Sequence, residues 1–306
     1  MIHESLLSLI GHTPHVRINR IDTKNAVIYA KCERFNPLGS SKDRAALYMI
    51  EMAEERGELV KGSVIIEPTS GNTGIALSYI AAIKGYECII VMPDTMSAER
   101  VRMIKALGSR IVLSDGKLGM KGAIARAEEL ASAIDRAFMP MQFDNSDNAL
   151  AHYRTTAVEI EADFGSSLDK IVFPVGSGGS ITGTARYFRE KGYKTKFVAV
   201  EPASSPVLSG GKSGRHAIQG IGAGFIPSIY DPTLTDEIVC VSDEEAFEMT
   251  RQLAQKEGIF AGISSGAALA GALKNAEEGE KILVFLPDSG ERYLSMPFWE
   301  EDGIRD

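Results

Sequence analysis

Short apolar runs rich in β-branched residues alternate with helix-like segments along the whole chain. Eight of these runs predict strands, at residues 27–32, 63–68, 88–93, 110–115, 170–175, 196–202, 237–242 and 281–287. Near-continuous apolar strands are typical of parallel sheets, whose two faces are both covered. Strands that alternate with helices favour an α/β architecture with right-handed crossovers, so the pattern predicts an α/β fold.

The segments between these runs predict helices at 43–59, 98–107, 121–137, 150–163 and 244–257. Gly108 follows the second of them as a C-cap. Ser242 and Glu245 have the Ser-x-x-Glu spacing of a capping box at the start of the helix predicted at 244–257. The stretch 140–148 (PMQFDNSDN) is predicted to be irregular and to mark the break between layers.

Composition limits the class of protein. A chain of 306 residues is long enough for about two domains, and its net charge of −8 gives no broad attraction to nucleic acid or anionic membranes. No run approaches the roughly 20 apolar residues of a membrane span, and the N-terminus does not resemble a signal peptide. The three cysteines form no CxxC pair, so we expect reduced thiols in the cytoplasm.

Two predicted strands lead into glycine-rich turns that are each followed by a helix. The turns lie at 69–74 (TSGNTG) and 176–180 (GSGGS). Their backbone N–H groups and the positive end of the following helix favour an anion. A structural tight turn is the alternative for either turn alone. Two such turns suit a ligand with two anionic ends, such as a phosphorylated cofactor joined to an amino acid.

Lys42 lies at a turn-to-helix junction in FNPLGSSKDR. A cation is disfavoured at a helix N-terminus, and a neutral imine there would remove this conflict. A solvated lysine is the alternative. The histidines show no metal-ligand spacing, so no metal site is predicted at His3, His12, His15, His152 or His216.

The chain resembles the cysteine synthase (O-acetylserine sulfhydrylase) family over essentially its whole length. The resemblance rests on eight motifs in order: NPLGSSKDR, PTSGNTG, QFDN, VGSGGSITG, EPASSPVLSGGK, QGIGAGFIP, GISSGAA and LPDSGERYLS. It implies pyridoxal 5′-phosphate and the tryptophan synthase β-like fold, with two domains that are each a twisted, mostly parallel sheet flanked by helices. The implied division is a smaller mobile domain at 36–145, with the lysine and substrate loop, and a larger domain at 1–35 plus 146–306, with the phosphate loop.

The resemblance implies roles for the cofactor-binding residues. Lys42 would form the Schiff base and then act as the base that removes the α-proton. Asn72 would hydrogen-bond the cofactor's ring oxygen, and Ser264 would face the pyridine nitrogen. A neutral hydroxyl there makes the cofactor a poorer electron sink, which favours rapid loss of a β-substituent. The implied phosphate cradle is Gly176, Ser177, Gly178, Gly179 and Ser180.

The substrate carboxylate would be held by Thr69, Ser70, Thr73 and Gln142. Gly222, in QGIGAGFIP, is a further substrate-binding candidate. Asp231, just after that motif, is a candidate base for water or a thiol at the rim of the site. A solvated loop aspartate is the alternative for Asp231.

The resemblance implies β-replacement on a serine-derived amino acid through an aminoacrylate. The favoured reaction converts O-acetyl-L-serine and sulfide to L-cysteine and acetate. The alternatives are a lyase or synthase that consumes cysteine and releases hydrogen sulfide, forming serine, pyruvate or a thioether, and a cystathionine β-synthase-like condensation. A catalytically silent binding protein and a nucleotide-binding dehydrogenase are the remaining hypotheses. The glycine pattern and the lysine ahead of the first glycine-rich turn argue against the dehydrogenase. The implied partners are a second copy of the chain and a serine acetyltransferase, whose C-terminal tail would dock in the active site.

Overall fold

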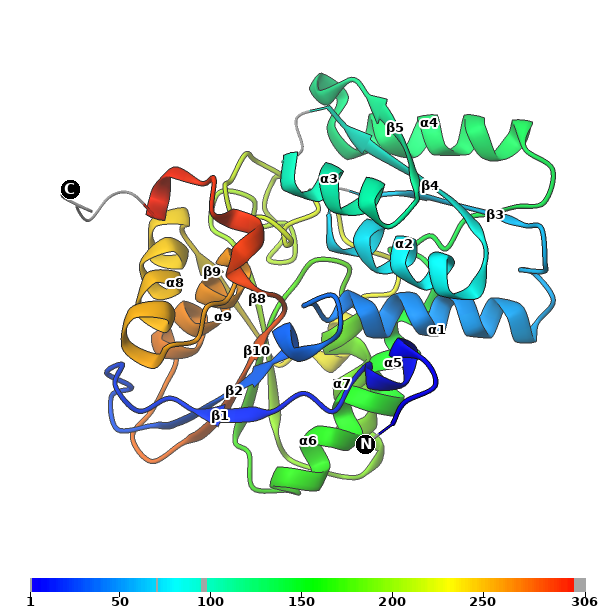
Figure 1. The fold of residues 1–306 in the computed structure, drawn as a ribbon. Coiled ribbons are helices and arrows are strands. Elements are labelled where there is room, and N and C mark those ends of the chain that lie inside the picture. The colour runs from blue at the N-terminus through cyan, green and yellow to red at the C-terminus, as the bar shows by residue number, and fades with distance from the viewer. Residues whose placement is uncertain (1, 70, 95–97, 300–306) are drawn as a thin grey trace.

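The computed structural model describes residues 2–69, 71–94 and 98–299 and contains two sheets (Figure 1). The larger sheet has the order β1 (His15–Arg17), β2 (Val27–Cys32), β10 (Lys281–Leu286), β7 (Lys170–Pro174), β8 (Lys196–Pro202) and β9 (Glu237–Val241). The smaller sheet has the order β5 (Arg110–Ser114), β4 (Glu87–Pro93), β3 (Val64–Pro68) and β6 (Ala137–Phe138). Neighbouring strands are parallel except for β1 and β2. The α/β fold with two mostly parallel sheets is confirmed.

All eight predicted strands are present, with bounds that differ from the prediction by one residue at most. The sequence did not predict β1 or β6, which have three and two residues. Strands that short carry too few positions to show an alternation of apolar and polar side chains.

Helices cover both faces of the smaller sheet. They are α1 (Lys42–Glu55), α2 (Asn72–Lys84), α3 (Ala98–Ala106) and α4 (Gly119–Ala133). Successive side chains of β3 show why the strand is apolar throughout: Ile65 packs with α1 and α2, whereas Ile66 packs with α4. Both isoleucines are fully buried.

The larger sheet is covered in the same way. Its helical elements are α5 (Ser146–Ala151), a π-helical turn (His152–Thr156), α6 (Ala157–Phe164), α7 (Gly179–Glu190), α8 (Asp243–Glu257) and α9 (Ile263–Lys274). In β10, Val284 packs with α8 and α9, and Phe285 packs with α6 and α7. The capping box of α8 is confirmed: Glu245 N donates to Ser242 Oγ at 3.2 Å, and Ser242 N donates to Glu245 Oε2 at 2.8 Å.

Two predicted helices and one predicted irregular segment need correction. The helix predicted at 43–59 ends at Glu55, because Gly57 adopts a left-handed φ of 71° and turns the chain back. The helix predicted at 121–137 runs from Gly119 to Ala133. The region predicted to be irregular at 140–148 already contains the start of α5, which is capped by Asn145 Oδ1 accepting from Asp147 N at 2.9 Å.

The segment predicted as one helix at 150–163 is a composite of three elements. It joins the end of α5, the π-helical turn and α6. Among the described residues, no helix is long and apolar enough to cross a membrane.

Candidate active site

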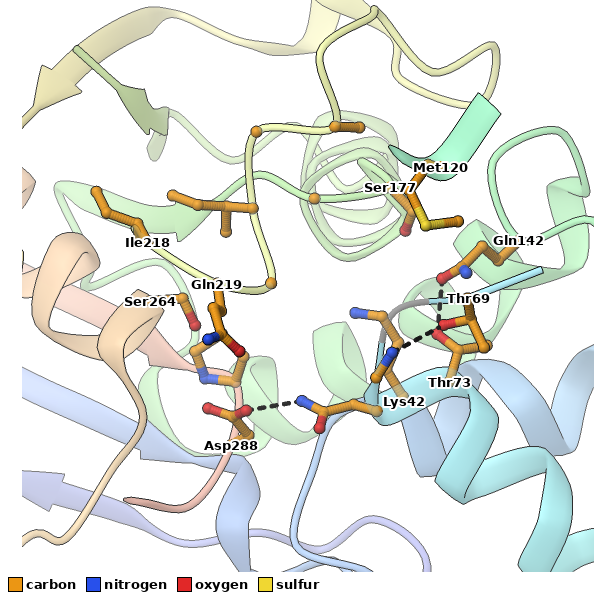
Figure 2. Close-up of a pocket in the computed structure, with 18 of the residues that line it drawn as sticks. Lys42, Thr69, Thr73, Met120, Gln142, Ser177, Ile218, Gln219, Ser264 and Asp288 are labelled. Carbon is orange, nitrogen blue, oxygen red and sulfur yellow. Dashed lines mark hydrogen bonds between the residues drawn. The ribbon is translucent and has the colours of Figure 1, made fainter. Parts of the chain in front are cut away.

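A cavity of about 310 Å³ lies at the carboxyl ends of the strands, between the two sheets (Figure 2). Parallel α/β sheets commonly bind ligands at this edge. Loops from both sheets contribute, since the loop after β3 and the loop after β7 both reach it. The predicted site residues that line it are Lys42, Thr69, Asn72, Thr73, Gln142, Gly176, Ser177, Gly222 and Ser264.

Lys42 is the first residue of α1, and its amine lies in this cavity. Burial lowers the pKa of Lys42, although the nearby carboxylates of Asp288 and Glu33 raise it. No described residue forms a hydrogen bond or ion pair with its Nζ. A buried amine that is easily deprotonated can act as a nucleophile and as a base.

The glycine-rich turn after β7 forms the N-terminus of α7. Gly178 adopts a φ of 84° at the N-cap, and Gly179 begins the helix. The turn is closely packed: a Cβ atom on Gly176 would lie 2.5 Å from Gly220 O, and one on Gly179 would lie 2.2 Å from Asn148 Oδ1. These glycines are therefore required by the close approach of neighbouring groups.

A second, smaller hollow of about 20 Å³ adjoins this turn. Hydroxyl and amide groups line it, from Ser41, Asn148, Ser177 and Ser180. His152 also lines it, and burial lowers the pKa of His152 to about 3, so its imidazole is neutral. With the backbone N–H groups at the start of α7, these uncharged groups suit a phosphate oxygen.

Asn148 was missed by the sequence analysis, although it fixes two parts of the site. Its Nδ2 donates to Gln142 O at 2.8 Å and to Ser177 Oγ at 3.0 Å. It lies in the first turn of α5, inside the stretch that was predicted to be irregular. No motif marked it as a link between the substrate loop and the phosphate turn.

Two of the residues predicted to hold the substrate carboxylate contact each other directly. Thr73 Oγ1 donates to Gln142 Oε1 at 2.6 Å, while Thr69 Oγ1 accepts from Gly71 N at 3.3 Å (Figure 2). Ser70 lies outside the described residues. Hydroxyl and amide donors around the N-terminus of α2 suit a carboxylate.

Ser264 is buried in the first turn of α9 and faces the cavity. It makes no hydrogen bond to any described residue, so its hydroxyl is available to a ligand.

Gly222 has a φ of 64°, and its carbonyl oxygen lies 3.1 Å from His216 Nε2. Asp231 is not among the described residues that line the cavity. Its Oδ1 instead caps a short 3-10 turn by accepting from Thr233 N at 3.0 Å.

Four polar residues of the cavity were not predicted as site residues: Asp288, Arg100, Gln219 and His216. Asp288 follows β10 in the LPDSGERYLS motif, which was a signal for family membership but not for a role. Arg100 belongs to α3, and its guanidinium donates across the cavity to Gln219 Oε1. A lone arginine in a helix looks like a solvated residue in sequence, so nothing in the chain indicated this contact.

These residues fit pyridoxal phosphate. The cavity offers a buried amine for the aldehyde and a hydroxyl at Ser264, without a partner among the described residues, for the ring nitrogen. The adjoining hollow offers hydroxyl, amide and backbone N–H groups at a helix N-terminus for the phosphate. The donor set does not suggest a metal, because no group of three or more His, Cys, Asp or Glu side chains among the described residues could hold one.

Comparisons with known proteins agree with this fit. Residues 6–288 match the model of the pyridoxal-phosphate dependent enzyme family. A probable cysteine synthase of Bacillus subtilis is 50% identical over 298 residues, covering 95% of this chain and 96% of that protein. A cysteine synthase of Staphylococcus aureus is 44% identical over 304 residues, covering 98% of each.

Solved structures show the same relationship. A hydrogen sulfide-producing enzyme from Fusobacterium nucleatum superposes with a TM-score of 0.93 at 50% identity, covering 96% of this chain and 100% of that one. O-ureido-L-serine synthase superposes with a TM-score of 0.96 at 41% identity, covering 100% and 98%. The chain therefore belongs to the cysteine synthase family of pyridoxal-phosphate dependent enzymes, with the tryptophan synthase β-like fold.

Proposed function

We propose that this enzyme converts O-acetyl-L-serine and sulfide to L-cysteine and acetate. The observation that carries the proposal is the position of the Lys42 amine, in one cavity with an anion-binding turn and a group of carboxylate-binding side chains. A ligand held at both anionic ends would have its α-carbon near this amine. The cysteine synthases among the relatives support the choice of reaction.

Each of the predicted site residues would have a separate role. The turn at 176–180 binds the cofactor phosphate, Asn72 donates to the cofactor's ring oxygen, and Ser264 faces the pyridine nitrogen. Thr69, Ser70, Thr73 and Gln142 bind the substrate carboxylate, with Gly222 near the substrate. Bound pyridoxal phosphate supplies the electron-withdrawing group that makes the α-proton acidic.

Lys42 then moves the proton. Its neutral Nζ takes the proton from the α-carbon of the substrate while the β-carbon loses acetate with the C–O bonding pair. The sulfur of hydrogen sulfide forms the new bond to the β-carbon, and Lys42 returns the proton to the α-carbon. The thiol keeps one hydrogen of the hydrogen sulfide, and the other leaves as a proton that balances the negative charge of the acetate. No electrons are gained from or lost to an external partner, so the reaction needs no oxidant or reductant.

A second function has one specific observation in its favour. The Fusobacterium nucleatum relative, at 50% identity, is a hydrogen sulfide-producing enzyme. The same cavity could take cysteine as donor, release hydrogen sulfide, and add water or a thiol in its place. Asp231 would have to approach the cavity to act as the base for that nucleophile, because its carboxylate caps a 3-10 turn in this structure. An O-acetylserine dependent cystathionine β-synthase from Helicobacter pylori, at 40% identity, shows that the nucleophile also varies among relatives.

The test is a comparison of donors on the purified holoenzyme. O-acetyl-L-serine with sulfide should yield cysteine and acetate in equal amounts, with a change in the cofactor's visible absorption on adding the donor alone. Lys42→Ala should lower turnover by more than about a thousandfold and abolish the covalent link to the cofactor. The exposed Lys117→Ala is the matched control and should retain full activity.

Faster release of hydrogen sulfide from cysteine than formation of cysteine would overturn the first proposal in favour of the second. By the family resemblance, we also propose a cytoplasmic homodimer that can bind a serine acetyltransferase tail. Sedimentation of the purified protein, with and without the tail peptide, tests this assembly.

A further inference from the structure

Asp288 is the centre of a buried hydrogen-bond network beside the cavity. It follows β10, and the side chain is 1% exposed. Its Oδ2 accepts from Asn72 Nδ2 at 2.7 Å, which is the dashed line at Asp288 in Figure 2. The same oxygen accepts from the Tyr293 hydroxyl at 2.6 Å. Its Oδ1 is buried and has no partner among the described residues. One carboxylate oxygen therefore carries both bonds.

The carbonyl oxygen of the Asn72 amide also has a hydrogen-bond partner. Asn72 Oδ1 accepts from Arg292 Nη1 at 2.9 Å. The same guanidinium donates to the carbonyl oxygens of Gly39 and Leu38, so Arg292 is itself fixed against the backbone that precedes α1. Arg292 is 5% exposed.

These two partners determine which way the amide faces. A carboxylate only accepts hydrogen bonds, and a guanidinium only donates them. The NH₂ group of Asn72 must therefore face Asp288, and its carbonyl must face Arg292. The reversed amide would place oxygen against oxygen at Asp288 and two donor groups against each other at Arg292.

With the Asn72 amide fixed in this orientation, one of its two N–H donors has no partner among the described residues. Asn72 Nδ2 carries two hydrogens, and Asp288 takes one of them. No other described residue accepts the second, and Asn72 lines the cavity. We propose that Asp288 and Arg292 are positioning residues, which hold the Asn72 amide so that this second N–H can donate to the ring oxygen of the bound cofactor. The inference rests on the role proposed for Asn72 and extends it to two residues of the C-terminal segment.

A double-mutant cycle on cofactor binding tests the inference. The dissociation constant of pyridoxal phosphate would be measured on apo-protein of the wild type, Asn72→Ala, Asp288→Ala and the double variant. Loss of one buried hydrogen bond corresponds to about a tenfold weaker affinity, and each single variant should show it. The double variant should be no more than about twofold weaker than Asn72→Ala, because Asp288 acts through Asn72.

Tyr293→Phe is the matched control. It removes the other hydrogen bond to the same carboxylate oxygen and leaves the Asn72 contact in place. Its cofactor affinity and the wavelength of the cofactor's visible band should stay at wild-type values. Thermal unfolding of each apo-protein reports whether the variant is folded. If Asp288→Ala does not fold, Arg292→Met in the same cycle tests the other end of the amide.

A loss of affinity from Asp288→Ala that is equally large in the Asn72→Ala background would overturn the inference, since Asp288 would then act elsewhere, for instance on Lys42. An equal loss in Tyr293→Phe would overturn it as well. The cycle uses no substrate. A failure to make cysteine from O-acetyl-L-serine would therefore refute the proposed reaction without affecting this result.

Discussion

At the scale of single residues, a buried carboxylate holds the loop that carries Gln142. Glu67 Oε2 accepts from Met141 N at 2.8 Å, and Oε1 accepts from Gln142 N at 3.1 Å. Burial raises the pKa of Glu67 to about 7, although these two backbone hydrogen bonds lower it. The group is therefore more easily protonated in the folded chain than in the unfolded one.

This shift predicts a pH dependence of stability. The contribution of Glu67 is fully present below its unfolded pKa of about 4.3 and is lost as the pH rises through about 7. Glu67→Gln removes the titration. The free energy of unfolding of the wild type, relative to Glu67→Gln, should fall by up to about 3 kcal/mol across this range. Urea unfolding of the two apo-proteins at several pH values measures the difference, and parallel pH profiles would contradict the prediction.

The residues that the sequence predicted and those it missed differ in one physical respect. Lys42, Ser264 and the turn at 176–180 lie in local motifs, where glycines and hydroxyls follow a strand or begin a helix. Asp288 and Arg100 form hydrogen bonds with partners more than 100 residues away in the chain, Asn72 and Gln219. Side-chain pairs of this kind leave no local pattern, so these contacts became visible only in the folded chain.

At the scale of elements, the N-terminus of α7 is fitted to its neighbours with no space for a side chain. A methyl group on Gly179 would lie 2.2 Å from Asn148 Oδ1, so either α7 shifts or Asn148 rotates. A rotated Asn148 would release both Gln142 and Ser177. We therefore expect Gly179→Ala to weaken pyridoxal phosphate binding by at least about tenfold, equivalent to one lost hydrogen bond.

Gly192→Ala is the control, just beyond the other end of the same helix. Gly192 has a φ of 75°, and a Cβ atom added there would have no heavy atom within 4 Å, so this change strains the backbone without touching the site. It should lower the melting temperature and leave cofactor affinity unchanged. The ³¹P chemical shift of the bound cofactor should move in Gly179→Ala alone. An unchanged shift in that variant would refute the steric argument.

The sequence predicted the type of those elements that have a clear pattern of apolar residues. It predicted the residues at which these elements end less well. Strands buried on both faces are apolar throughout, as the two packing directions of Ile65 and Ile66 show. The helix end at Glu55 is marked by the left-handed Gly57, a local signal that the prediction did not use. The helix end at Ala133 has no glycine at its C-cap to mark it. The π-helical turn at His152–Thr156 joins two α-helices directly and contains no glycine or proline, so the sequence could not separate it from its neighbours.

At the scale of the whole molecule, the contacts between the two halves are unequal. We propose that residues 36–145 move as a smaller domain against residues 1–35 and 146–306. On one side, the buried Arg44 of α1 binds Glu33 at 2.7 Å and Glu159 at 2.6 Å, which ties α1 firmly to the larger half. On the other side, Arg100 of α3 reaches Gln219 across the cavity, and its guanidinium lies 5.2 Å from the centre of the Tyr293 ring.

This asymmetry predicts where the molecule opens. Two buried ion pairs at Arg44 are costly to break, and the buried hydrogen bonds of Asn72 to Asp288 and Arg292 also join the halves. Among the described residues, separation at Arg100 breaks only one hydrogen bond to a neutral amide and one contact with an aromatic ring. The halves should therefore pivot near Arg44 and part at Arg100. Arg100→Met should speed hydrogen exchange in the peptide that carries Gln219 and weaken O-acetyl-L-serine binding by about tenfold, the value of one hydrogen bond to a charged group.

The exposed Arg102→Met on the same helix removes an equal charge and is the matched control. Its exchange rates and substrate affinity should equal those of the wild type. If Arg100→Met instead speeds exchange around Glu33 and Glu159, the pivot lies on the opposite side of the cavity. Substrate should slow exchange at Gln219 in the wild type, because its carboxylate draws the loops at Thr73 and Gln142 toward the larger half. In Arg100→Met, adding substrate should slow hydrogen exchange at Gln219 by a smaller factor than in the wild type. The closed arrangement of this variant lacks the hydrogen bond from Arg100 to Gln219 that spans the cavity.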